Sequence, residues 1–261
     1  MTDKYLYMRV PFKLRVPIFK SKTFNFEFVF EKRFSTKETI ISLGSACHPA
    51  HLLDAMKFRK QSFPFDWLNT DSISGMQYVC ENIKLKFKYF TTDLIINKEN
   101  HISASRYMYS CFFHHPTILT DKNVLETYAK RSNRFLNTLQ TQACVFLYSA
   151  TSASLNTIND VNKLVNAIIE FMQLVKSNDK LLVYITFEES LQENKENCDF
   201  LISNLKKINQ VNCTCFLLEE KKYGLWGYEN NYYALLKELG LNIKIKFPKI
   251  SIVKTALNKQ L

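Results

Sequence analysis

One cysteine of the chain lies where the sequence predicts a corner between a strand and a helix. The apolar residues 40–43 favour a strand, and Gly44 and Ser45 allow a tight turn before Cys47. Pro49 suits the first turn of a helix, because its missing N–H needs no partner there. The free N–H groups at such a helix start favour a thiolate, with a pKa of roughly 3.5–7.5. We therefore expect Cys47 to be a nucleophile.

A cysteine nucleophile needs a base, and a third group usually orients that base. His114 and His115 follow an aromatic run, so at least one of them should reach open space and act as the base. A surface histidine in the loop before Pro116 is an equally plain interpretation. Asp66, within the segment SFPFDW, could orient the base or bind substrate, or it could simply cap a turn.

The other cysteines and histidines leave one alternative open. Six cysteines lie in apolar or amphipathic runs and are expected to pack in the core: Cys80, Cys111, Cys144, Cys198, Cys213 and Cys215. Cys47 and His51 share one helical face, so they could bind a metal together with the histidine pair. Zinc-type spacing is absent, and we therefore expect neither a metal nor a cofactor.

The elements that must position these residues follow a βα rhythm. The pattern predicts strands over 40–43, 143–148, 181–187, 213–218 and 243–247, and helices after Asp71, Asp121 and Asp160, around 200–208 and over 232–239. Strands alternating with helices imply right-handed crossovers, so we expect an α/β fold with a mostly parallel sheet and helices on both faces. Ligands of such sheets bind beyond the carboxyl ends of the strands, where Cys47 would lie.

The N-terminal segment differs from the rest of the chain in composition and periodicity. Residues 1–36 are basic and aromatic, and Phe24, Phe26, Phe28 and Phe30 recur with the period of a β-strand. We expect an N-terminal β extension over 1–36 and a single α/β domain over 37–261. The extension would either enlarge the core or bind a partner.

The composition of the chain narrows the classes of protein to which it can belong. The 261 residues are 46% hydrophobic and 14% aromatic, which is enough for a core, and no apolar run is long enough to span a bilayer. The seven cysteines lack the spacing of a secreted disulfide framework, and no secretory signal is apparent, so we expect a cytoplasmic protein. The net charge of +11 is spread along the chain, and we expect no specific nucleic-acid binding.

Several of these segments together resemble a known family. The run ISLGSACHPAHLL, the motif S-x-PFDW, and an F-x-H segment before a basic helix resemble a family of papain-like cysteine peptidases of unknown function from poxviruses, other large DNA viruses and bacteria. The matching residues are Ser42 to Gly44, Cys47, Ser62 to Trp67 and Phe113 to His115. The resemblance implies Cys47 as nucleophile and His115 as base. Family members often have Asp after this His, but Pro116 follows here, so we assign the assisting role to Asp66.

Three functional hypotheses follow. The first is a cysteine-dependent hydrolase or acyl transferase, such as a papain-like peptidase, acting on a protein or a small acyl substrate. Its candidate substrate-binding residues are Ser45, Ser62, Trp67 and His114. The second is an esterase-like or transferase α/β enzyme in which Asp66, and not the cysteine, is the key residue. The third is a noncatalytic viral interaction protein in the host cytoplasm that holds a host partner through residues 1–36.

Overall fold

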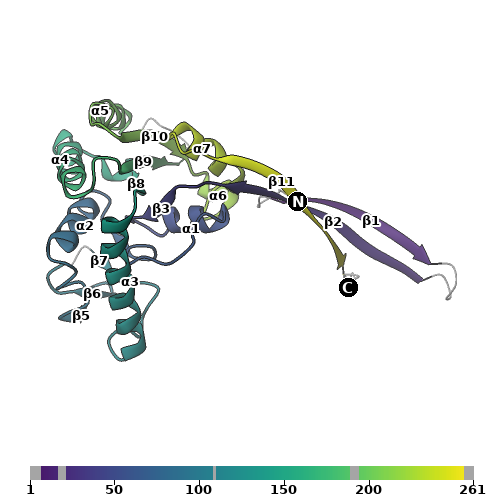
Figure 1. Cartoon of the computed structure of the whole chain (residues 1–261), viewed down its shortest axis with the longest axis horizontal. Coiled ribbons are helices and arrows are strands. Elements are labelled where there is room, and N and C mark those ends of the chain that lie inside the picture. Colours follow the sequence, from purple (N-terminus) through teal and green to yellow (C-terminus); the bar gives the residue numbers. More distant parts are fainter. Residues whose placement is uncertain (1–6, 17–21, 108–109, 189–193, 256–261) are drawn as a thin grey trace.

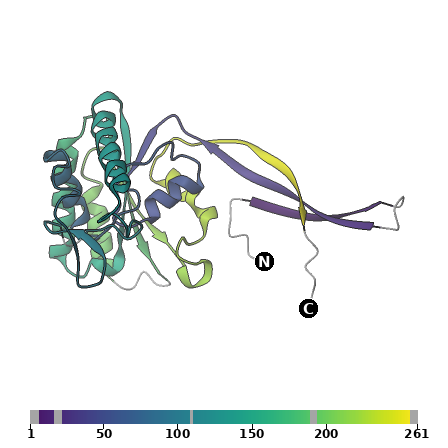
Figure 2. The same cartoon turned by 90° about the horizontal axis from the view of Figure 1, so that it is seen from below.

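The structure is a computed structural model, and it describes residues 7–16, 22–107, 110–188 and 194–255. The described residues form an α/β body from which a long, narrow sheet projects, as Figures 1 and 2 show from two directions. Residues 1–6 and 17–21 of the expected N-terminal extension lie outside the described residues.

A sheet of four parallel strands forms the centre of the body. Its strands, in spatial order, are β10 (Val211–Leu217), β9 (Lys180–Phe187), β8 (Cys144–Thr151) and β3 (Thr39–Ser42). The inner strand β8 is almost entirely buried and the central residues of β9 are buried, as expected for a parallel sheet that is covered on both faces. The parallel α/β architecture predicted from the sequence is confirmed.

Helices cover both faces of this sheet (Figure 1). One face packs against α2 (Gly75–Lys84), α3 (Lys122–Thr141), α4 (Ile158–Leu174) and α5 (Lys195–Leu205), and the other against α1 (His48–Ala55) and α7 (Tyr232–Glu238). Strand β8 divides its side chains between the two cores, because neighbours on a strand point to opposite faces. Phe146 and Tyr148 enter the larger core, whereas Val145 and Leu147 enter the smaller one.

Three helices begin where an aspartate side chain binds backbone N–H groups at or just ahead of the first turn, or takes part in a capping box. Asp121 is the N-cap of α3 and accepts a hydrogen bond from the N–H of Asn123. Asp160 lies in the first turn of α4 and forms a capping box with Thr157. Asp71 binds the N–H groups of Ile73 and Ser74 just ahead of α2. The three aspartates therefore mark helix starts, as the sequence predicted.

Residues 88–120, which show no regular period in the sequence, fold into short strands and turns. The short elements of the chain are β4 (Asn69–Thr70) paired with β7 (Ser110–Cys111), β5 (Leu94–Ile96) paired with β6 (Ile102–Ala104), α6 (Glu220–Tyr223), and 3₁₀ turns at Ser152–Ser154 and Glu229–Asn231. The β4–β7 pair joins two segments that are about 40 residues apart in the chain.

The projecting sheet combines both ends of the described chain. Its antiparallel strands are β1 (Tyr7–Val16), β2 (Lys22–Ser35) and β11 (Lys244–Thr255), in the order β1-β2-β11. The phenylalanine alternation indeed marks a strand, β2. The partner on its other edge comes from the C-terminal part of the chain, so the extension is not made by the N-terminal segment alone. We call this three-stranded sheet the arm.

Burial along α4 predicts where the body is sensitive to substitution. Leu164 is fully buried in the larger core, whereas Ile158 at the start of the same helix is 59% exposed. Leu164→Ala should lower the free energy of unfolding by about 2–5 kcal/mol, because it leaves a cavity. Ile158→Ala should change it by less than about 0.5 kcal/mol. Urea unfolding of both variants measures the difference, and equal effects would contradict this packing.

Candidate active site

The turn between β3 and α1 places Cys47 at the end of the sheet. Gly44 has a φ of 90°, a backbone conformation that favours glycine, and Cys47 is the N-cap residue of α1. Ser45 holds this turn from two sides. Its hydroxyl donates to the carbonyl of Ser149 at 2.7 Å, and its own carbonyl accepts from the N–H of Thr70 at 2.6 Å. The predicted strand-to-helix corner is thus present.

Two polar side chains contact the thiol of Cys47. The distance from its Sγ to Nε2 of His114 is 2.9 Å, and the distance to Oδ1 of Asn69 is 3.2 Å. A thiol has one hydrogen, so it donates to only one of these partners at a time. When it donates to Asn69, the sulfur can accept from His114; when it donates to His114, the imidazole is in position to take the proton. The sequence interpretation missed Asn69, although it lies only two residues after the PFDW motif.

Strand pairing brings His114 to the cysteine. Asn69 in β4 lies opposite Cys111 in β7, and the chain then turns, with the N–H of His115 bonded to the carbonyl of Phe112 at 2.9 Å. His114 is exposed within this turn. Its ring lies edge-on to Trp67, with the ring centroids 5.6 Å apart. The imidazole is therefore held from the side of the PFDW motif.

The histidine at the thiol is not the one that the family resemblance implied. His115 packs edge-on against Tyr128, with the ring centroids 5.2 Å apart. Burial lowers the pKa of His115, and nearby Arg131 lowers it further. We expected His115 as the base and His114 as a substrate-binding residue, but among the described contacts it is His114 that reaches Cys47. Adjacent residues of a turn point in different directions, and spacing alone does not say which one faces the cysteine.

The protonation state of the thiol also differs from our expectation. Burial and, to a smaller extent, the neighbouring Cys111 together raise the pKa of Cys47 to about 11. The side chain is 8% exposed, so the charged form loses most of its hydration. The start of α1 was expected to favour a thiolate, but this loss of hydration has the larger effect. At neutral pH the site therefore holds a thiol, and a reaction through it requires a base.

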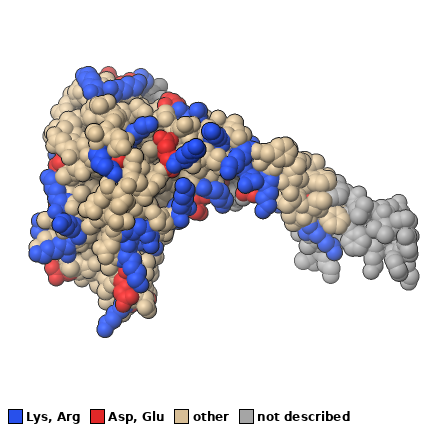
Figure 3. Space-filling model, viewed as in Figure 1, with Lys and Arg blue, Asp and Glu red and all other residues tan. Residues whose placement is uncertain are grey.

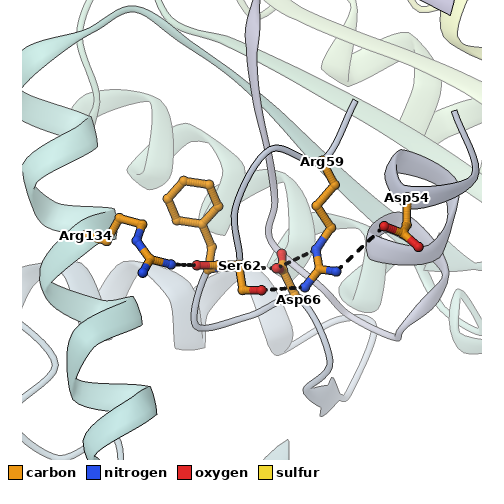
Figure 4. Close-up of polar contacts among 6 residues, drawn as sticks. Asp54, Arg59, Ser62, Asp66 and Arg134 are labelled. Carbon is orange, nitrogen blue, oxygen red and sulfur yellow. Dashed lines mark hydrogen bonds and ion pairs between the residues drawn. The ribbon is translucent and has the colours of Figure 1, made fainter. Parts of the chain in front are cut away.

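Asp66 fixes the PFDW turn and does not contact His114 in the structure. Its carboxylate accepts from the N–H of Phe63 at 2.9 Å and from Nε of Arg59 at 3.0 Å (Figure 4). Burial raises the pKa of Asp66, whereas the Phe63 N–H and the Arg59 guanidinium lower it. The role in orienting the base that we expected for Asp66 has no support from these contacts. The plainer interpretation of an aspartate that caps a turn fits them.

Two arginines complete the frame around this turn (Figure 4). Arg59 also donates to the hydroxyl of Ser62 at 2.8 Å, and Arg134 of α3 donates to the carbonyl of Ser62 at 2.6 Å. The Arg59 guanidinium lies 5.4 Å from the centre of the Trp67 ring, close enough for a cation–π interaction. Ser62 and Trp67, which we expected to bind substrate, are thus parts of the frame, and Trp67 links that frame to His114.

A cavity of about 470 Å³ opens beside the thiol. Ser45, Cys47 and His114 line it, together with four apolar side chains, Phe113, Leu218, Leu225 and Trp226. The Trp226 ring is stacked on His51 with centroids 4.0 Å apart, and His51 contacts Glu229 at 2.8 Å. The cavity therefore combines a thiol and an imidazole with apolar lining.

The metal alternative has no geometric support in the described part of the chain. His51, which it required, contacts Glu229, and His48 is buried against the hydroxyl of Tyr184 at 2.6 Å. Burial lowers the pKa of His48 to about 4, so this imidazole is neutral at physiological pH. Within the described residues, no group of three or more His, Cys, Asp or Glu side chains could hold a metal ion.

A thiol at the start of the helix after the first sheet strand, with an imidazole against it, defines a Cys–His site on a parallel α/β scaffold. Residues 38–170 match the model of the family described as putative papain-like cysteine peptidase (DUF1796), and the chain belongs to this family. The matched range includes Cys47, Asn69 and His114. The family resemblance seen in the sequence is confirmed.

Other comparisons add a viral relative. The chain is 24% identical over 233 residues to an uncharacterized protein of Acanthamoeba polyphaga mimivirus, covering 80% of this chain and 99% of the relative. No solved structure matches the chain. Among the described helices, none is both long and apolar enough to cross a membrane.

The raised pKa of Cys47 predicts how its thiolate appears with pH. With a pKa of about 11, the thiol remains protonated at pH 7 and only about 1% is ionised at pH 9. The ultraviolet absorbance of thiolates near 240 nm, taken as wild type minus Cys47→Ser, should therefore stay flat from pH 5 to 9 and rise only above that range. A step at or below neutral pH would instead indicate a thiolate–imidazolium pair.

The buried ion pair predicts a stability difference between two arginines. Arg59→Leu should lower the free energy of unfolding by about 3–5 kcal/mol at pH 7, because Asp66 is then buried without its partner. Arg9→Ala removes the exposed pair with Glu27 in the arm and should cost only about 0–1 kcal/mol. The Arg59→Leu loss should shrink as the pH falls through the raised pKa of Asp66, and it should be smallest below about pH 4, where the carboxyl is protonated in the folded and unfolded states. Equal losses for both variants in urea unfolding would contradict this assignment.

Proposed function

We propose that the protein is a cysteine-dependent hydrolase or acyl transferase with Cys47 as nucleophile and His114 as general base. The observation that carries this proposal is the 2.9 Å contact between Sγ and Nε2 at the edge of a cavity. Membership of a family described as papain-like peptidases supports the same class of chemistry. His114 takes the role that the sequence interpretation gave to His115.

In the proposed first step, the sulfur attacks a carbonyl carbon of the substrate. The S–C bond forms while the S–H proton moves to Nε2 of His114, which is required because the raised pKa of Cys47 leaves the thiol protonated. Negative charge develops on the carbonyl oxygen. The N–H groups of His48 and Ala50, in the first turn of α1, have no partner within the helix and are our candidates to stabilise that oxygen. Pro49 between them has no N–H.

In the second step the intermediate collapses to a thioester. The bond to the leaving group breaks, and that group takes the proton from His114. Water or another acceptor then attacks the thioester carbon and gives its proton to His114, and the S–C bond breaks as the product acid or acyl compound forms. The sulfur recovers the proton from His114. Asn69 acts as a positioning residue in this scheme, because its Oδ1 lies 3.2 Å from Sγ and holds the thiol toward the cavity.

The walls of the cavity favour a substrate with an apolar group next to the scissile carbonyl. Phe113 and Leu225 are 52% and 59% exposed, respectively, yet both line the cavity. Exposed apolar side chains at a cavity entrance lose contact with water when an apolar ligand binds. We therefore propose an apolar acyl chain, or an apolar side chain of a protein substrate, as the group that occupies this wall.

Activity toward an acyl ester tests the proposal. The probe is 4-methylumbelliferyl butyrate, and Cys47→Ala should lower its turnover by at least about a hundredfold, since the nucleophile is lost. His114→Ala should lower turnover by about a hundredfold or more, through loss of the base. Cys215→Ala and His115→Ala are the matched controls and should retain the wild-type rate. Hydrolysis that survives Cys47→Ala would reject the cysteine mechanism and favour an enzyme that does not use the thiol.

The noncatalytic alternative also has one observation behind it, the long arm that projects from the body (Figure 2). If binding of a host protein through the arm is the function, that binding should persist in Cys47→Ala and His114→Ala and be lost when the arm is altered. Figure 3 shows lysines and arginines scattered over the visible face, with acidic residues between them. That face presents no continuous basic stripe of the kind that binds nucleic acid.

A further inference from the structure

The side chain of Trp226 lines the cavity beside the thiol and is half-buried. It lies in a tight turn directly after α6. The N–H of Gly227 bonds to the carbonyl of Gly224 at 2.8 Å and closes this turn, so Leu225 and Trp226 are its two central residues. Gly227 has a φ of 65°, and a side chain there would collide with the carbonyl of Leu218. The turn therefore presents two neighbouring apolar side chains to the cavity.

Contacts to both its ring and its backbone hold Trp226 in place. The indole is stacked on the imidazole of His51, with the centroids 4.0 Å apart and the planes inclined by 13°. The carbonyl of Trp226 accepts from the hydroxyl of Tyr232, and Nε2 of His48 lies 3.3 Å from the same oxygen. His51 is held in turn by Glu229, which its Nε2 contacts at 2.8 Å. The indole is therefore a fixed part of the cavity.

The position of His51 places the indole close to the nucleophile. The N–H of His51 bonds to the carbonyl of Cys47 at 3.0 Å in the first turn of α1. One turn of an α-helix advances about 5.4 Å along its axis. Because Trp226 is stacked on His51, its ring lies about one helical turn along α1 from Cys47. An acyl group of several carbon atoms on the sulfur can reach a ring at that distance.

The cavity lining holds no side chain with a permanent charge among the residues that the structure describes. It contains no Asp, Glu, Lys or Arg there, although 23% of the whole sequence is charged. Burial lowers the pKa of His48, which also lines the cavity, to about 4, so this imidazole is neutral at physiological pH. A carboxylate or phosphate that entered would lose hydration with no Lys or Arg to pair with it, which costs free energy. The cavity therefore favours an uncharged group.

We propose that the site selects an uncharged, apolar acyl group and that Trp226 determines this specificity by packing against it. This inference rests on the proposed function, because the acyl group is the one that Cys47 carries as a thioester. Aromatic side chains bury a large apolar area, and a ring that is already held in place adds little ordering cost on binding. Leu225, in the same turn, is 59% exposed and gains apolar contact when the acyl group binds.

Alkylation of Cys47 in the full chain by two matched reagents tests the proposal without requiring turnover. The reagents are 2-iodo-N-hexylacetamide and 6-(iodoacetamido)hexanoic acid, which share the reactive group and the chain length and differ by a terminal carboxylate. Mass spectrometry of the Cys47 peptide gives the ratio of the two rates. Because both reagents react with the same sulfur, its protonation state cancels from this ratio. Wild type should favour the hexyl reagent at least about tenfold more than free glutathione does.

Substitutions in the turn assign the selectivity to its residues. Trp226→Ala should lower the ratio at least about fivefold, and Leu225→Ala at least about threefold, through loss of apolar contact. Ile158→Ala is the matched control, because Ile158 is 59% exposed like Leu225 and does not line the cavity, and it should leave the ratio unchanged. Circular dichroism checks folding, and Leu225→Ala keeps the test decisive if Trp226→Ala does not fold.

Two results would overturn the proposal. One is a wild-type ratio equal to that of glutathione. The other is a wild-type ratio that persists in the folded variants of the turn. Either result, together with ester hydrolysis that depends on Cys47, rejects this specificity alone and leaves the proposed function standing. Hydrolysis that survives Cys47→Ala rejects the proposed function, and the acyl specificity with it.

Discussion

The buried ion pair between Arg59 and Asp66 is the constraint on which the site depends. It fixes the turn of the PFDW motif, and this turn and the residues just after it contact His114, Cys47 and Ser45. Asp66 is 2% exposed and binds both Arg59 and the backbone of Phe63. From this turn, Trp67 reaches the ring of His114, Asn69 reaches the thiol, and Thr70 binds the carbonyl of Ser45. Breaking a buried pair leaves an unpaired charge, so the turn is costly to deform. The PFDW motif is thus explained by the need to hold this turn in place beside Cys47 and His114.

The protonation state of Cys47 reflects two opposing effects on the thiol. The start of α1 favours negative charge, but burial of the sulfur disfavours it, and burial dominates. A neutral thiol does not attack a carbonyl efficiently by itself. The proposed mechanism is therefore closer to that of a serine–histidine pair than to that of a preformed thiolate. In both, the S–H or O–H proton must move to the base as the bond to the carbonyl carbon forms. In the proposed mechanism His114, whose Nε2 contacts the sulfur, receives that proton.

The sequence was informative wherever one local signal determined the structure. The strand at 40–43, the helix starts marked by Asp121 and Asp160, and the parallel sheet follow from apolar periodicity and capping. It failed where side chains distant in the chain meet. The choice between His114 and His115 depends on a turn whose direction β4 and β7 set. The arm's third strand likewise comes from the far end of the chain.

The reactivity of Cys47 toward iodoacetamide at pH 7.5, followed by mass spectrometry of the labelled peptide, tests the central claim that this thiol and His114 act as a pair. Wild type, His114→Ala and His115→Ala are compared, with circular dichroism to confirm folding. The account predicts that labelling slows at least about tenfold in His114→Ala, since the base is lost, and is unchanged in His115→Ala. Slow labelling in His115→Ala with a normal rate in His114→Ala would contradict it.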